Sequence, residues 1–124
     1  MIRIKHLMDT VDNDDGPRLL VERDGLTRDL TEWCAVDHVL TNVAPPKALA
    51  RWFERHPSEY THFREMYHDF LRKSRYRPSL NELAGASVID NYTLLHVGDD
   101  PDFNSASALA EFLSSEGYQG RQAG

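Results

Sequence analysis

Short apolar runs separated by turn residues predict the strands of this protein. The apolar run at residues 19–21 follows turn residues at 15–17 and leads into the charged pair Glu22-Arg23. That order is typical of a turn followed by a buried strand, predicted here over residues 18–23. In open α/β folds ligands bind beyond the carboxyl ends of strands, so the end of this strand is the first place to expect a site.

Two further strands are predicted from the same kind of pattern. Residues 2–8 mix apolar and basic side chains in partial alternation, and residues 92–97 form a continuous β-prone run that suits a buried parallel strand. Val88-Ile89 is also strand-like. Residues 9–17 are crowded with aspartate, asparagine and glycine, so they are predicted to form a loop whose carboxylates lie in solvent.

Helical patterns occupy the middle of the chain. The proline pair at 45–46 is predicted to start a short helix and Pro57 a longer one, because proline suits the first helical turn. Ser79 and Glu82 form a capping-box pair for a short helix that ends near Gly85. The longer helix carries an aromatic stripe at helical spacing, which predicts a face buried against the sheet and formed by Tyr60, Phe63, Tyr67, Phe70 and Leu71.

The remaining patterns complete the expected fold. A last helix is predicted from Asn104 or Ser105 to Gly117, followed by a flexible polar tail at 118–124. Residues 24–42 have weak periodicity and are predicted to be an irregular loop, with a helical turn as an option, anchored by Leu30, Trp33, Val36, Val39 and Leu40. The chain of 124 residues fits one domain. The expected fold is therefore α/β, a single compact three-layer domain over residues 1–117 with a small, mainly parallel sheet flanked by helices.

Charge and cysteine content narrow the function classes. The formal net charge is -6, which disfavours nucleic-acid binding through phosphate neutralisation. The basic cluster at residues 72–77 could touch RNA or an acidic partner, but cations are also favourable at a helix C-terminus. Cys34 is the only cysteine, which excludes an internal disulfide and suits a reducing cytoplasm. No apolar stretch approaches transmembrane length, so a cytoplasmic protein without a membrane segment is expected.

No standard catalytic, cofactor or metal signature is present in the sequence. The loop after residues 92–97 carries Asp99, Asp100 and Asp102, and these carboxylates would repel phosphate from the N-terminus of the following helix. A glycine-rich phosphate loop, a Gly-x-Ser-x-Gly elbow, Cys/His zinc spacing and a calcium-loop pattern are all missing. His96 could act as a general base, but no partner for it can be assigned. Neither a cofactor nor a metal is expected.

Motifs along nearly the whole chain resemble one family. They begin with Ile4-Lys5, Asp9 and Asp15-Gly16-x-Arg18-x-Leu20-Val21-Glu22-Arg23, and continue through Pro45, Leu49, Phe53, Phe63-Arg64, Tyr67, Thr93-Leu94-Leu95, Asn104, Leu109 and Leu113. These residues are similar to those of the bacterial domain-of-unknown-function family 488 (DUF488), the YeaO-like proteins. The resemblance implies a compact three-layer α/β fold and carries no established activity.

The chain departs from the family pattern at polar positions. Thr27 stands where the family has a second arginine after its second strand, and Arg28 follows one residue later. Asp99 occupies a usually basic position, and the run at 103–105, Phe-Asn-Ser, replaces His-Asn-His. The loss of both histidines and of a basic residue puts any activity of the family in doubt for this chain.

Three functional hypotheses remain open. The first is a non-catalytic family member that binds a small anionic ligand or a protein partner, because Lys5, Arg23 and Asn104 are retained while the histidine pair is missing. The second is a low-specificity enzyme on a phosphate- or nucleotide-like substrate, with Arg23 and Arg28 as an anion clamp and His96 as the proton-transfer group. The third is an interaction module that uses the basic cluster.

A pocket joining Arg23, His96 and Asn104 would favour the enzyme, and a filled crevice would favour the first hypothesis. The candidate ligand-binding residues are Lys5, Arg23, Arg28, His96 and Asn104.

Overall fold

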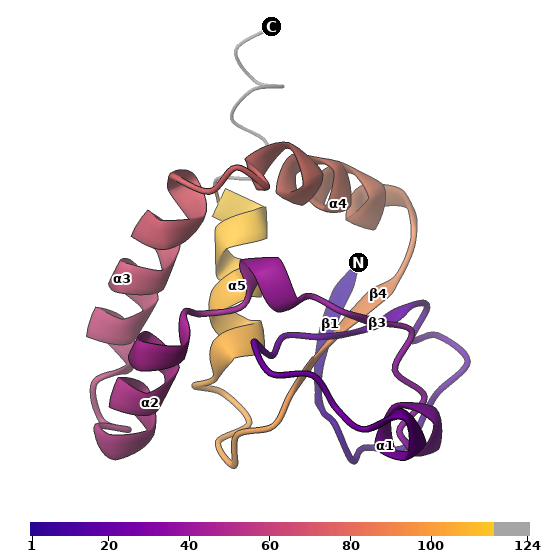
Figure 1. The fold of residues 1–124 in the computed structure, drawn as a ribbon. Helices are drawn as coiled ribbons and strands as arrows, with labels where there is room; N and C mark the ends of the chain where they lie inside the picture. The colour runs from indigo at the N-terminus through magenta and orange to yellow at the C-terminus, as the bar shows by residue number, and fades with distance from the viewer. Residues whose placement is uncertain (116–124) are drawn as a thin grey trace, which may run out of the picture.

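Four parallel strands form the sheet of this protein, in the order β1-β4-β2-β3 (Figure 1). The computed structural model describes residues 1–115. The strands are β1 (Ile2–His6), β2 (Arg18–Leu20), β3 (His38–Val39) and β4 (Tyr92–His96). The three strands predicted from the sequence are confirmed, each shorter than expected. β3 was not predicted, since two residues are too few to show a period-two pattern.

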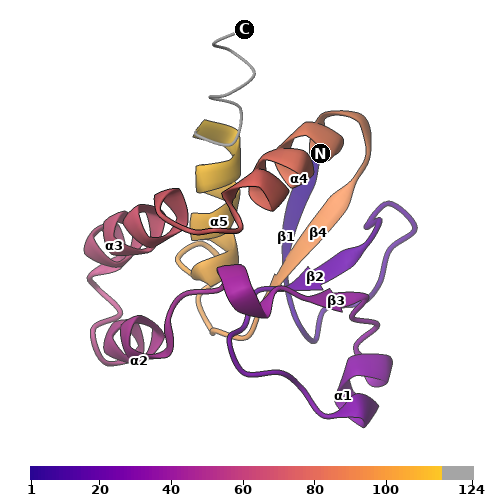
Figure 2. The same ribbon diagram turned by 45° about the horizontal axis from the view of Figure 1, so that its top comes forward.

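Helices cover the sheet mainly on one face. Within residues 1–115 they are α1 (Arg28–Trp33), the 3-10 turn η1 (Thr41–Val43), α2 (Lys47–Arg55), α3 (Tyr60–Arg72), α4 (Arg77–Ile89) and α5 (Ser105–Ser115). α5 contacts β4 and β1, while α3 and α4 pack against α5, and α2 packs against α3. α1 lies on the opposite side of the sheet from α3 and α5 (Figures 1 and 2).

The buried strands divide their side chains between two hydrophobic clusters. Leu19 and Leu94 belong to the large cluster under α3, α4 and α5. Leu20 and Leu95, the next residue of each strand, point into a smaller cluster with Leu7, Cys34 and Val36. Successive strand side chains alternate between faces, so a sheet with two apolar faces must be covered on both sides. The α/β three-layer fold expected from the sequence is therefore confirmed.

The aromatic stripe of α3 is buried, as predicted, but most of its packing is against helices. Tyr60, Phe63, Tyr67 and Leu71 are buried, and Phe70 is half-buried. The main packing partners of α3 are α2 and α5. His68, which the stripe did not include, is also buried, with its Nε2 atom 2.7 Å from the carbonyl oxygen of Ala108 on α5.

The expectation for residues 79–89 is wrong. Instead of a short helix followed by a strand, α4 runs without a break through Gly85 to Ile89. Its N-cap is Tyr76, so the capping box at Ser79 does not form. Val88 and Ile89 are exposed on the last helical turn, and β4 already has β1 and β2 as neighbours. Local β-propensity is overridden because no strand position is left beside β4 for this pair.

The irregular segment at 24–42 is more ordered than predicted, because it contains both α1 and β3. Its apolar side chains differ in their roles. Val36 is buried, whereas Trp33 is 81% exposed and therefore does not anchor the segment. No residue of α1 is buried. The anchor comes instead from the turn after α1, where Cys34 also enters the smaller cluster.

The loop at 9–17 contains a buried ion pair, which corrects the expectation that its carboxylates all lie in solvent. Asp12 and Asp14 are exposed, but Asp15 and Arg18 are buried, with Arg18 Nη1 2.7 Å from Asp15 Oδ2. Arg18 also donates to the carbonyl oxygens of Asp9, Cys34 and Ala35. One side chain thus ties the β1–β2 loop and the end of α1 to the sheet.

Gly117 and the tail at 118–124 lie outside the described residues, so the predicted domain end is not addressed by the structure. Within residues 1–115, no helix is both long enough and apolar enough to cross a membrane.

Candidate functional site

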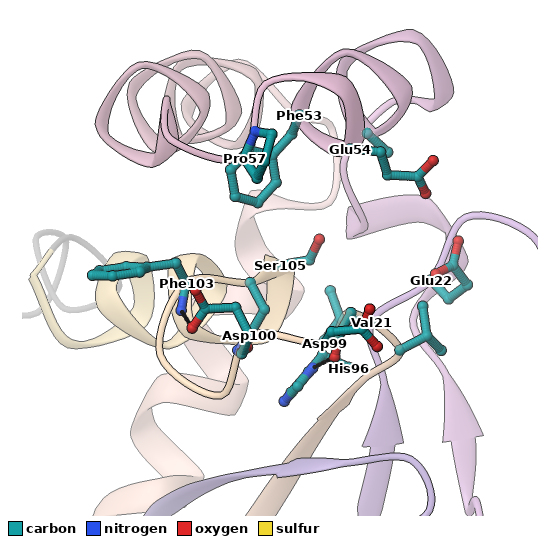
Figure 3. A pocket seen from close by; sticks show the side chains of 14 residues that line it. Val21, Glu22, Phe53, Glu54, Pro57, His96, Asp99, Asp100, Phe103 and Ser105 are labelled. Carbon is teal, nitrogen blue, oxygen red and sulfur yellow. Dashed lines mark hydrogen bonds between the residues drawn. The ribbon is translucent and has the colours of Figure 1, made fainter.

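A cleft of about 520 Å³ opens beyond the carboxyl ends of β2 and β4 (Figure 3). Three parts of the chain build it: the residues after β2, the loop from β4 into α5, and one side of α2. The lining residues are Val21, Glu22, Ala50, Phe53, Glu54, Pro57, His96, Val97, Gly98, Asp99, Asp100, Phe103, Asn104 and Ser105. This is the strand-end position at which open α/β folds bind ligands.

The loop between β4 and α5 is shaped by its own polar side chains. Asp100 Oδ1 accepts hydrogen bonds from the backbone N–H groups of Asp102 (2.9 Å) and Phe103 (3.1 Å). Asn104 Nδ2 donates to the carbonyl oxygen of Asp100 at 3.0 Å, and its Oδ1 accepts from the N–H of Ser107 at 2.8 Å. Asn104 therefore caps α5, which confirms the predicted start of that helix.

Two aromatic side chains form apolar walls of the cleft. Phe53 on α2 stacks on Phe63 with ring centroids 4.3 Å apart, and this contact fixes its position. Phe103 lies at the mouth, half-exposed, with its ring 5.0 Å from that of Tyr60. Aromatic faces of this kind can hold an apolar stem or, through their quadrupole, a cation.

The charged side chains that line the cleft are all carboxylates: Glu22, Glu54, Asp99 and Asp100. Neither lysine nor arginine is among the lining residues. Burial raises the pKa of Glu22, and the negative charges of Asp24 and Glu54 act in the same direction, against nearby backbone N–H groups. The cleft is therefore an electronegative site.

His96 is the one imidazole of the cleft. Its side chain is 4% exposed, its Nδ1 lies 3.0 Å from the carbonyl oxygen of Gly98, and its ring meets that of His6 edge to face at 5.3 Å. A carbonyl oxygen only accepts, so Nδ1 carries the proton and Nε2 of the neutral ring is an acceptor. Burial lowers the pKa of His96, opposed by the Gly98 carbonyl and assisted by the charge of His6.

The lowered pKa of His96 predicts a loss of stability on acidification. The unfolded chain titrates this group near its ordinary value of 6.5, whereas the folded chain binds the proton only at lower pH. The unfolded state then holds more protons, so the His96 contribution is complete above 6.5 and is lost as the pH falls through the folded pKa. Urea unfolding at a series of pH values measures this loss. Below pH 6.5 the slope of the free energy of unfolding against pH should be shallower for His96→Gln than for the wild-type protein. His62→Gln, at an exposed position of α3, should retain the slope; equal slopes in all three proteins would contradict the assignment.

Three of the five candidate residues lie away from the cleft. Lys5 pairs with Asp15 and Asp12 at 2.7 and 2.8 Å, and these partners raise its pKa. Arg23 donates to the carbonyl oxygen of Ala44 at 2.6 Å and lies over the ring of Phe70.

The side chain of Arg28 is 91% exposed, and its Nε lies 3.5 Å from Glu32 Oε1 on the same helix. Of the candidates, only His96 and Asn104 line the cleft. The two arginines proposed as an anion clamp therefore do not converge on it.

Sequence reasoning missed several of the lining residues. Glu22 and Asp99 carried a usable signal, since each follows a buried strand whose carboxyl end meets the others at one edge of the sheet. Phe53 and Glu54 carried none, because only the packing of α2 against α3 brings that helix over the strand ends.

The free cysteine lies away from the cleft, and residues 1–115 hold no metal-binding cluster. Cys34 is buried in the smaller cluster with its Sγ 3.7 Å from Met8 Sδ, away from the cleft. Across residues 1–115, no group of three or more histidine, cysteine, aspartate or glutamate side chains is placed to hold a metal ion.

Comparison with known proteins gives the family. The sequence profile that matches residues 1–123 is that of DUF488-N3i, the inactive DUF488-N3 subclade. The chain belongs to this family. The resemblance to DUF488 seen in the sequence is therefore confirmed.

Proteins similar to this DUF488 member are known from mycobacteria. An uncharacterized protein of Mycobacterium bovis and two of Mycobacterium tuberculosis are each 30% identical to it over 120 residues, covering 91% of this chain and 93% of each relative. No solved structure gives a significant match.

Proposed function

We propose that this DUF488 protein is a non-catalytic binding protein of the bacterial cytoplasm that holds a protein partner at its strand-end cleft. The observation that carries the proposal is the cleft itself, an open volume of about 520 Å³ at the edge of the sheet with aromatic walls. Large concave sites with apolar walls and a few polar groups are the usual places for binding.

The absence of catalysis is supported by the family and by the chemistry of the lining. The matching profile describes an inactive subclade. In this chain the polar residues that line the cleft include one imidazole, and Asn104, whose amide is used to cap α5. General acid–base chemistry needs a positioned group within reach of a reacting atom and a second group to complete the step.

A protein partner is favoured over a small anionic ligand by the charges of the lining. Four carboxylates surround the opening, and like charges repel an anion. The enzyme hypothesis is weakened for the same reason, since a phosphate-like substrate needs cations and Arg23 and Arg28 are engaged elsewhere.

The basic cluster at 72–77 is less suited to a docking role than the cleft. Lys73 pairs with Asp69 at 2.9 Å on the preceding helical turn. Arg75 lies over the ring of Tyr76 and Arg77 over that of Phe112, at 5.6 and 5.0 Å. These cations interact within the fold, as expected at the junction between two helices.

Site-specific photo-crosslinking in the parent organism tests the proposal. A photoreactive p-benzoylphenylalanine at position 103, at the mouth of the cleft, should give a discrete protein adduct. The same group at position 66 on α3 should not, although Phe103 and Met66 are similarly exposed at 51% and 48%. The adduct from position 103 should disappear in an Ala50→Trp variant, since Ala50 lines the cleft and the larger side chain fills it.

Two results would overturn this function. The first is an adduct that forms equally from position 66 or persists after the cleft is filled. The second is turnover of a nucleotide or phosphoester by the purified protein that is lost in His96→Gln, which would establish the enzyme instead.

A further inference from the structure

We propose that the strand-end cleft recognises a single positive charge on a short apolar stem, a guanidinium or primary ammonium group. This inference rests on the proposed function, because it names the chemistry of what the same cleft holds. It replaces the anionic ligand that the retained Arg23 and Lys5 suggested from the sequence.

The first observation is a set of carboxylates without a paired cation. Glu22, Glu54, Asp99 and Asp100 come from three separate parts of the chain and line one opening. Figure 3 places Glu22 and Glu54 on neighbouring elements at one end, with Asp99 and Asp100 across from Glu54 on the β4–α5 loop. The ion pairs of the described residues include none of the four.

The repulsion among these carboxylates has a local consequence. Glu22 is half-buried, and its pKa is raised by burial and by the charges of Asp24 and Glu54. A cation in the cleft would remove part of this repulsion, and an anion would add to it. Binding of a cation is therefore coupled to full ionisation of Glu22.

The second observation is the imidazole. His96 is nine-tenths buried and lines the same cleft. Its Nδ1 proton goes to the carbonyl oxygen of Gly98, and its Nε2 has no hydrogen-bond partner among the described residues. Nε2 of this tautomer is an acceptor, so it is free to accept a hydrogen bond from a ligand. Guanidinium and ammonium groups have only donors, which matches an acceptor lining.

The walls suit the rest of such a ligand. Phe53 and Phe103 offer aromatic surface, and Val21, Ala50 and Pro57 add aliphatic surface. Aromatic faces attract cations, and arginine and lysine bury their methylene stems on apolar surface while the charge stays in a polar setting. A volume of about 520 Å³ is ample for one such side chain.

The same chemistry has two sources, a free small amine and a basic side chain of a protein. Butylguanidine represents the first and a capped Gly-Arg-Gly peptide the second, and each carries one guanidinium. Butylurea is an uncharged analogue of similar shape, and AMP represents the anionic ligands.

Heteronuclear NMR titration of the full chain with these four probes tests the inference. Butylguanidine and the peptide should shift the backbone amide signals of residues 97–105, weakly enough to be in fast exchange and less at higher ionic strength. Butylurea and AMP should leave these signals unchanged. Tighter binding of butylguanidine indicates a free small cation as the ligand, and tighter binding of the peptide indicates a partner side chain.

Charge-neutral variants make the test specific. Removing a charged hydrogen-bond partner costs about tenfold in affinity, so Glu22→Gln with Asp99→Asn should weaken butylguanidine binding by roughly a hundredfold. Glu65→Gln with Glu82→Gln removes the same charge from exposed positions outside the cleft and should have little effect. The spectra of both double variants also report whether the fold is intact.

The outcomes separate the two proposals. Shifts at 97–105 with butylurea or AMP but not with the cations would overturn the cationic ligand and leave a binding cleft. No shift with any probe, together with a specific crosslink from position 103, would also overturn it while the partner-binding function stands. No shift and no crosslink would overturn both.

Discussion

Replacing the buried arginine Arg18 by methionine should lower the free energy of unfolding by about 3 to 5 kcal/mol. The substitution keeps most of the side-chain volume but leaves Asp15 buried, with Lys5 and the more distant Arg3 as its remaining cations. It also leaves the carbonyl oxygens of Asp9, Cys34 and Ala35 without the guanidinium donors that they have in the native fold. Urea unfolding of the purified proteins measures the effect.

The ionisation of Asp15 supports this expectation. Burial alone would raise the pKa of Asp15, but hydrogen bonds from Lys5 and Arg18 hold it below its usual value. The stability from this carboxylate is therefore present above its unfolded pKa of 3.8 and lost as the pH falls through the lower folded pKa. Without Arg18 the shift becomes smaller or reverses, so acid unfolding should begin at higher pH.

An exposed arginine provides the control for this prediction. Arg28→Met breaks an ion pair with Glu32 on the surface of α1, at an arginine that is 91% exposed. Exposed pairs contribute little, so the change should be within about 0.5 kcal/mol. Similar losses from the two substitutions would show that the buried pair has no special role in holding the β1–β2 loop.

Gly16→Ala should be the second strongly destabilising change, at roughly 2 to 5 kcal/mol from backbone strain and overpacking together. Gly16 has a φ of +62°, in the left-handed region that favours glycine. A Cβ at this position would lie 1.9 Å from the carbonyl oxygen of Asn91, which is backbone and cannot move aside. The neighbouring Asp15 carbonyl also accepts a hydrogen bond from Thr93 Oγ1, so the loop cannot shift freely.

A second glycine gives the matched control. A Cβ at Gly25 would meet nothing within 4 Å, so Gly25→Ala should leave the denaturation midpoint nearly unchanged. If Gly16→Ala were equally harmless, the close approach of the β1–β2 loop to the start of β4 would be incorrect.

These two residues show why the Asp-Gly-x-Arg motif is found in this sequence. The motif was read as the entrance to a strand with a site at its far end. The structure shows that Asp15, Gly16 and Arg18 hold the loop and sheet together, since all three are used in internal contacts. Their chemistry is structural, and the cleft lies at the opposite end of β2.

The sequence by itself determined the three main strands, the helices α2, α3 and α5, and the family. These elements were readable because each carries its own signal: a β-prone run, prolines shortly before a helix rather than in its first turn as predicted, an aromatic stripe or an asparagine cap. Val88-Ile89 was misread because its strand-like pattern competes with a helix that continues from Tyr76, and local pattern cannot decide between them.

Only the tertiary structure decided which polar residues face one another. Lys5 and Arg23 were candidate ligand residues because both are retained from the polar pattern of the DUF488 family, but their partners, Asp15 and the Ala44 carbonyl, are supplied by other segments. Glu54 enters the cleft because α2 packs over the strand ends, 32 residues beyond Glu22 in the sequence by the difference of their numbers. The burial of each side chain and the sign of the charge that lines the cleft depend on neighbours that are distant in the sequence. They are therefore decided only when the chain folds.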